Sequence, residues 1–156
     1  MVKATGSGKT KRQMVESIAE YAIGLLMPRL KGKLDIRIEL VACLKAKESI
    51  AGDCIWEDRS HKPREFTIRV DSTQPRQDML ETVAHEMVHV KQYSRGELKD
   101  VARSIKYCRW NGKEINTSRT NYFDQPWEIE AHGREKGIFV RWLEQSKWKD
   151  VYWADY

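Results

Sequence analysis

Hydrophobic residues recur at helical spacing in three segments of the chain. In the first, residues 12–30, apolar positions lie three or four apart until Pro28 interrupts the pattern. A second helix is predicted with Pro75 in its first turn and its end near Gly96, and a third is predicted to begin at Pro126. The positions expected to be buried on the second helix are Met79, Leu80, Val83, Ala84, Met87 and Val88.

Strict alternation of apolar and polar residues predicts strands over residues 34–40 and 66–70. Residues 52–57 are expected to form another short strand. Asn111-Gly112 is typical of a tight hairpin turn. Because strands and helices are largely segregated along the chain, we predict an α+β fold. Its small, mainly antiparallel sheet of about three strands would pack on the N-terminal helix, the helix after Pro75 and the C-terminal helix.

The length of 156 residues is suited to a single domain, predicted over residues 11–156, with a flexible N-terminus over residues 1–10. Residues 6–10 resemble part of a phosphate-binding loop. Lys3 occupies the position where that loop requires its first glycine, and no strand is predicted before it. We therefore reject a nucleotide site there.

Charge and composition limit the classes of partner that the sequence supports. The net charge of +5 permits contact with nucleic acid, but the basic residues are scattered, so nothing in their pattern supports it. No apolar run has the length of a membrane span, and the polar, basic N-terminus lacks the apolar core of a signal peptide. We expect a cytoplasmic protein with no membrane partner. The pattern does not indicate an oligomeric state.

The predicted second helix contains the sequence His85-Glu86-Met87-Val88-His89, an HExxH motif. Residues four apart share one helix face, so both imidazoles can reach the same metal ion, expected to be zinc. Glu86, beside the first histidine, is placed to act as general base toward water. The motif predicts a zinc hydrolase site on this helix.

A catalytic zinc ion takes three protein ligands and leaves one position open, so a third ligand must come from elsewhere. The predicted third helix offers Glu128, Glu130 and His132. Glu128 and His132 share a face at a spacing of four residues, whereas Glu130 points to roughly the opposite side. Glu128 is the preferred third ligand, with His132 either supporting the site or replacing Glu128 as a ligand.

The HExxH motif and the later segment Glu128-Ile-Glu-Ala-His132 together resemble the gluzincin branch of zinc metallopeptidases. The resemblance is above all to the minimal gluzincins and the small HExxH proteins often encoded by bacteriophages. The resemblance covers about residues 34–143, and only the two motifs are specific. It implies the ligands His85, His89 and Glu128 and the base Glu86. His132 stands where an aspartate is commoner. It also implies a virion-associated location if the chain is phage-encoded.

A second resemblance is to SprT-like peptidases, which are DNA-associated and take a later histidine as third ligand. His132-Gly133 fits that pattern loosely, but Lys136 stands where an aromatic residue is expected, and no zinc ribbon is present. A third possibility is a zinc-stabilised binding or structural module without activity. Metal retention with loss of proteolysis in Glu86→Gln would distinguish the peptidase from that module.

The expected reaction is hydrolysis of a peptide bond in a peptide or protein substrate. Transition-state stabilisation needs a donor near the developing oxyanion. Tyr122, just before the last helix, is the preferred candidate, and Tyr107 and Arg103 are alternatives. The substrate is expected to add a strand to a sheet edge, at residues 54–57 or 66–70.

Overall fold

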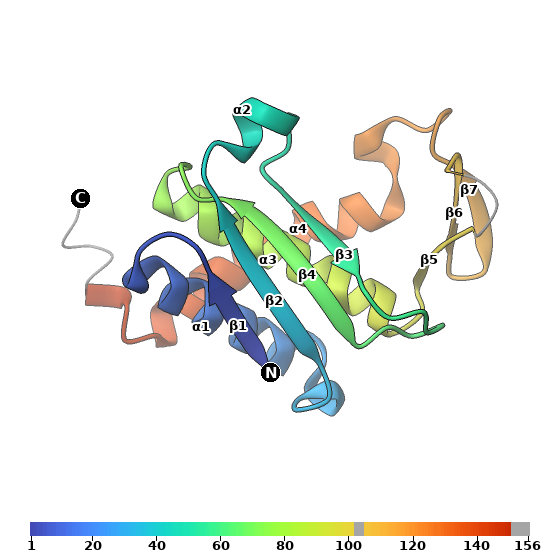
Figure 1. Ribbon diagram of the computed structural model, residues 1–156. Coiled ribbons are helices and arrows are strands. Elements are labelled where there is room, and N and C mark those ends of the chain that lie inside the picture. The colour runs from blue at the N-terminus through green and yellow to red at the C-terminus, as the bar shows by residue number, and fades with distance from the viewer. Residues whose placement is uncertain (102–104, 151–156) are drawn as a thin grey trace.

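A four-stranded sheet forms one layer of the protein, and its long helices lie behind it in the computed structural model (Figure 1). The structure describes residues 1–101 and 105–150. Its helices are α1 (Lys9–Leu26), α2 (Leu44–Glu48), α3 (Arg76–Ser94) and α4 (Pro126–Gln145), with short 3-10 turns η1 (Pro28–Leu30) and η2 (Tyr122–Asp124). Its strands are β1 (Val2–Thr5), β2 (Asp35–Val41), β3 (Gly52–Trp56), β4 (Glu65–Asp71), β5 (Leu98–Asp100), β6 (Tyr107–Trp110) and β7 (Lys113–Asn116).

The predicted combination of a small sheet with an N-terminal, an HExxH-bearing and a C-terminal helix is confirmed. The sheet itself differs from the prediction. It has the order β1-β2-β4-β3, and only the β3/β4 pair is antiparallel. The connections through α1 and through α2 with β3 each return the chain to the same end of the sheet, and such crossovers produce parallel pairs. The alternation of apolar and polar residues carries no information on strand direction, so it could not predict these parallel pairs.

The N-terminus also differs from the prediction of a flexible segment. Val2–Thr5 form the edge strand β1, in parallel register with β2 from Ile36 to Glu39. A strand therefore does precede the loop that resembles a phosphate-binding loop. The carbonyl oxygens of Gly6 and Ser7 accept hydrogen bonds from Arg12, so this loop presents acceptors to a cation. Of the two reasons for rejecting a nucleotide site, the missing strand no longer holds, whereas Lys3 in place of the first glycine still does.

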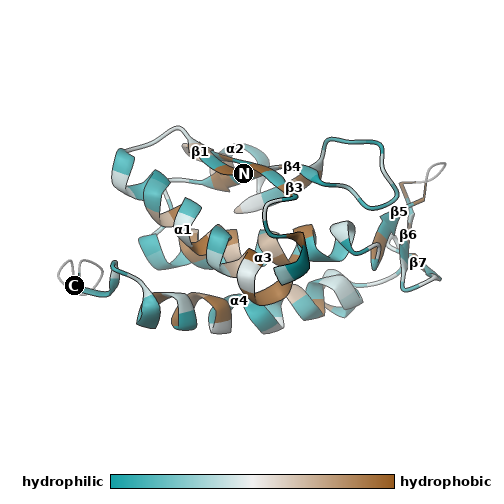
Figure 2. Cartoon of the chain, turned by 90° about the horizontal axis from the view of Figure 1, so that it is seen from below, coloured by the Kyte–Doolittle hydropathy of each residue, from teal (hydrophilic) through white to brown (hydrophobic). Residues whose placement is uncertain are grey.

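Helix α3 lies between two other layers, with the sheet on one side and α4 on the other (Figure 2). Its predicted apolar stripe is fully buried against the sheet and α1. Because α4 covers the opposite face, polar residues of α3 are buried there as well: His85, His89, Lys91 and Gln92. Glu86 is buried beneath β3, and Ser94 is buried against Met27. Buried polar groups are costly unless they are paired, so this face needs a dedicated set of partners.

Strands β5, β6 and β7 form a second, antiparallel sheet at one end of the molecule (Figure 1). The predicted turn at Asn111-Gly112 joins β6 to β7, and both residues have positive φ, as a two-residue hairpin of this kind requires. Among the described residues, no helix is both long enough and apolar enough to cross a membrane.

Candidate metal centre

Three buried side chains from α3 and α4 bring their donor atoms to one point. His85 Nε2 and His89 Nε2 lie 3.2 Å apart. One carboxylate oxygen of Glu128 lies 3.2 Å from His85 Nε2, and the other lies 3.3 Å from His89 Nε2. All three residues are less than one-tenth exposed. This group can hold a metal ion, as predicted from the HExxH motif and the later helix.

The local sequence explains the geometry. His85 and His89 are one turn apart on α3, so their rings leave the helix on the same side. Glu128 lies in the first turn of α4, which packs along that side of α3. The hydroxyl of Tyr122, in the turn just before α4, donates a hydrogen bond to Glu128 at 2.6 Å. Tyr122 therefore holds the carboxylate in place from the solvent side.

The second ring nitrogen of each histidine has its own acceptor. His85 Nδ1 lies 2.7 Å from a carboxylate oxygen of Glu135, and His89 Nδ1 lies 2.8 Å from the amide oxygen of Gln92. A carboxylate and an amide oxygen accept hydrogen bonds, so each neutral ring carries its proton on Nδ1. Both Nε2 lone pairs then face the common point. Such outer partners fix ring orientation and ligand basicity at metal sites.

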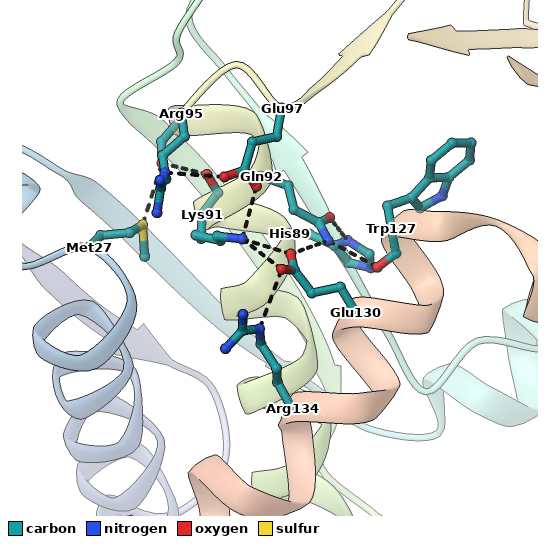
Figure 3. Close-up of polar contacts among 10 residues, drawn as sticks. Met27, His89, Lys91, Gln92, Arg95, Glu97, Trp127, Glu130 and Arg134 are labelled. Atoms are coloured by element: carbon teal, nitrogen blue, oxygen red, sulfur yellow. Dashed lines mark hydrogen bonds and ion pairs between the residues drawn. The ribbon is translucent and has the colours of Figure 1, made fainter. Parts of the chain in front are cut away.

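Gln92 is itself held in a buried network, drawn in Figure 3. Its amide nitrogen donates to the carbonyl oxygen of Trp127 at 2.9 Å and to Glu130 at 3.0 Å. Glu130 also accepts from Lys91, which forms a further ion pair with Glu97 at 2.9 Å. Because both partners of the amide nitrogen are acceptors, the amide oxygen must face His89. The network thus selects the tautomer of that ring.

The charges of the metal-free site are strongly coupled. Burial lowers the pKa of His85, but hydrogen bonds to Glu128 and Glu135 outweigh it and raise the pKa to about 10. Burial also opposes charge on His89, whose pKa is nevertheless raised by Glu128. Burial would raise the pKa of Glu128, yet its hydrogen bonds to both histidines hold that pKa well below the usual range. A site with this much negative charge retains a cation, either protons or a metal ion.

Glu86 lies beside this group and has a different environment. It is 6% exposed, and its carboxylate forms no hydrogen bond or ion pair with the described part of the chain. Burial raises its pKa to about 7, an effect partly offset by the neighbouring histidines. It lines two cavities that meet at the metal group. A buried carboxylate with a pKa near neutrality can exchange a proton with a molecule in these cavities.

Strand β3 passes directly over Glu86 at Gly52. A Cβ atom at this position would lie 2.6 Å from Thr82 Cγ2, 2.8 Å from the carbonyl oxygen of Arg69 and 3.4 Å from Glu86 Oε1. Glycine is therefore required for the strand to approach α3 so closely.

The remaining predicted site residues differ in whether the structure brings them to the metal group. The structure brings Tyr122 and His132 to the metal group: the His132 ring lies 4.5 Å from that of His85, and its Nδ1 is 3.3 Å from Glu135. Glu130 does not reach the group of donor atoms; it pairs with Lys91 and accepts a hydrogen bond from Gln92, both on α3. Tyr107 lies on β6, where its hydroxyl accepts from Asn116, and it lines neither cavity at Glu86. Arg103 lies outside the described residues.

Glu135 and Gln92 were not predicted, although the sequence contained a signal for both. Glu135 follows Glu128 by seven residues, which places both on one face of α4. Gln92 follows His89 by three residues, a spacing at which helical side chains meet. A search for acceptors at helical spacing from each ligand would have found them.

Comparison of the chain with protein-family models, curated proteins and solved structures gave no match.

Proposed function

We propose that the protein is a zinc-dependent peptidase that hydrolyses peptide bonds, with Glu86 as general base. The observation that carries this proposal is the buried, unpartnered carboxylate of Glu86 beside the donor atoms of His85, His89 and Glu128. A purely structural metal site has no use for such a group, because an unpaired buried carboxylate is costly.

Zinc is the metal that we infer for the site. Bonds of about 2.0–2.1 Å in a tetrahedron require donor atoms about 3.3 Å apart. The donor atoms are separated by 3.2–3.3 Å. Two imidazoles and one carboxylate are also a donor set that zinc favours over magnesium or calcium. Three protein donors leave a fourth position for water or substrate, as catalytic zinc sites do.

A bound zinc ion supplies a Lewis acid that makes water a better nucleophile and polarises the scissile carbonyl group. Glu86 accepts the proton of the attacking water and delivers it to the departing amine. Tyr122 is half-exposed and lines both cavities at Glu86. Its single O–H, which donates to Glu128 in this structure, would turn to the carbonyl oxygen as negative charge develops there. Gln92 and Glu135 keep the two imidazoles in the required tautomer.

The substrate is proposed to bind along β3. Strand β4 is paired on both sides, by β2 and β3, whereas β3 is an edge strand of its sheet within the described chain. A peptide added to the open edge of β3 would satisfy backbone groups that have no partner strand. Because Gly52 lies against Glu86, the scissile bond of such a peptide would pass over the catalytic carboxylate.

The arrangement favours the gluzincin-like reading over the SprT-like one. The carboxylate of Glu128, and not the ring of His132, completes the convergent group of donor atoms. His132 has 39% of its side chain exposed and directs Nδ1 toward Glu135. In the gluzincin pattern, the position of His132 supports the site. Here that support passes through Glu135, which both His132 and His85 contact.

The test compares zinc-loaded wild type with Glu86→Gln on a mixture of unstructured peptides, with cleavage products identified by mass spectrometry. We expect Glu86→Gln to retain zinc and to lose about 10²–10⁴-fold in rate, the usual contribution of a general base. Glu144→Gln, an exposed change near the end of α4, serves as the matched control. Absence of cleavage by zinc-loaded wild type would favour a non-catalytic zinc module.

A further inference from the structure

Two cavities meet at Glu86, and they differ in whether the other carboxylates that line them already have a charged or metal-site partner. One extends along the N-terminal half of α3, has a volume of about 520 Å³, and contains the carboxylates of Asp78, Glu81 and Glu135. The other extends along the C-terminal half of α3, has a volume of about 300 Å³, and contains Leu98 and several aromatic and thiol side chains. Its carboxylates besides Glu86 are already engaged, because Asp53 pairs with Arg69 and Glu128 lies against the two histidines. We name them the acidic cavity and the apolar cavity.

The acidic cavity is built to receive a cation. Among the described residues its lining contains no lysine or arginine. Asp78 and Glu81 form no ion pair within the described chain, and Glu81 accepts only from the amide of Gln77. Glu86, more than nine-tenths buried and without a hydrogen-bond partner in the same part of the chain, lines the inner end of this cavity. Low-dielectric walls strengthen the field of like charges in such a cleft.

The cavity also matches the shape of a long basic side chain. Ile50 and Ala51 supply apolar surface on the side of β3, while Asp78 and Glu81 lie on the side of α3. Lysine and arginine side chains combine an aliphatic stem with a charged end, and they pack the stem on apolar surface while the charge meets polar groups. Arginine, with a planar fork of donors, can bind two oxygens of one carboxylate.

The direction of β3 determines which side of the scissile bond enters which cavity. Ser49 and Ala51, which precede Gly52, line only the acidic cavity, and Asp53 and Cys54, which follow it, line only the apolar cavity; Ile50 and Gly52 lie where the two cavities meet. Antiparallel pairing is the more stable arrangement for an added strand. A peptide antiparallel to β3 therefore runs from the apolar cavity to the acidic cavity, from its N-terminal to its C-terminal residues.

From this geometry we infer that the substrate has a lysine or arginine immediately after the cleaved bond and a bulky apolar residue before it. The inference rests on the proposed peptidase function and specifies its substrate class. Asp78 and Glu81 are the specificity-determining residues. Glu135 contributes charge, but its bond to His85 also serves the metal group.

The test is a peptide library with every residue type on each side of the cleaved bond, incubated with the zinc-loaded full chain. We expect kcat/KM to be at least about tenfold higher for lysine or arginine than for glutamate after the bond, as favourable and unfavourable charge contacts predict. In the double variant Asp78→Asn/Glu81→Gln this ratio should fall to about threefold or less, while zinc content is unchanged. Both positions are at the surface or partly exposed, so folding should not be affected. Glu144→Gln is again the control.

The outcomes separate the two proposals. Cleavage with no preference for a basic residue, or a preference that survives in the double variant, would overturn the specificity inference and leave the peptidase in place. A basic preference before the bond would overturn the antiparallel direction. No cleavage of any peptide would overturn the proposed function and this inference with it.

Discussion

The two histidines of the metal group are held in contrasting ways. His85 donates to Glu135, a charged partner that is partly open to the acidic cavity. His89 donates to Gln92, a neutral partner that is fully buried and fixed by Trp127 and Glu130. The charge of Glu135 makes His85 a more basic ligand, whereas the rigid surroundings of Gln92 fix the orientation of the His89 ring. Helix α4 therefore supports the two rings differently. It supplies the charged acceptor of His85 directly, and it fixes the neutral acceptor of His89 through Trp127 and Glu130.

The largest effect is expected from breaking the buried ion pairs beneath Gln92. Lys91→Met leaves Glu97 and Glu130 without the cation that lies 2.9 and 2.8 Å from them. Removal of one partner of a buried pair typically costs about 3–5 kcal/mol. We expect chemical denaturation to show a loss of this size in the free energy of unfolding. Arg95→Ala is the matched control, since Arg95 is half-exposed and pairs with the same Glu97; its loss should stay below about 1 kcal/mol.

The next largest effect is expected from removing Gln92, the neutral partner of His89. Gln92→Leu has a similar volume but removes the acceptor of His89 Nδ1–H. We expect the affinity for zinc, measured by competition with a chelating dye, to fall by about 10–100-fold, as loss of an outer partner does at other metal sites. Gln145→Leu, an exposed change on α4, should leave the affinity unchanged. Equal affinity in Gln92→Leu and wild type would show that the network has no influence on His89.

The affinity for zinc should also depend on pH. In the metal-free protein the pKa of His85 is raised to about 10, so this ring carries a proton at pH 7 that zinc must displace. Raising the pH removes the competing proton, and the apparent affinity should rise by about tenfold per pH unit for one displaced proton. Calorimetry in buffers of different ionisation enthalpy would count the protons released. An affinity that falls as the pH rises from 6 to 8 would contradict this assignment.

The smallest effect is expected from changing Glu135, the charged partner of His85. Glu135→Gln keeps an oxygen that can accept from His85 Nδ1–H and removes only the charge. We expect the affinity for zinc to fall by about tenfold or less. Glu135→Leu, which removes the acceptor as well, should cost more. If both variants bind zinc as wild type does, the contrast between the two histidines is wrong.

The parts of the fold that depend on short-range spacing were predictable, and those that depend on long-range pairing were not. The spacing of His85 and His89 placed both on one helix face, and Asn111-Gly112 indicated its hairpin. Strand β1 was missed because its hydrogen bonds come from Ile36 and its neighbours, far along the chain.

In the candidate site, too, local spacing was predictable and long-range packing was not. Glu128 was preferred over His132 from spacing and resemblance, and the structure brings its carboxylate to both histidines. Only the apolar stripe of α3 was predicted to be buried. The burial of Lys91 and Gln92 was not foreseen, because it depends on where α4 packs, which no local pattern encodes.

The most direct test of the metal centre is the zinc content of Glu128→Ala and His132→Ala after gel filtration, measured by elemental mass spectrometry beside wild type. The two residues are one turn apart on α4, so they form a matched pair. We expect about one zinc ion per chain in wild type and in His132→Ala, and loss of most zinc in Glu128→Ala. Full zinc content in Glu128→Ala together with loss in His132→Ala would contradict the ligand assignment.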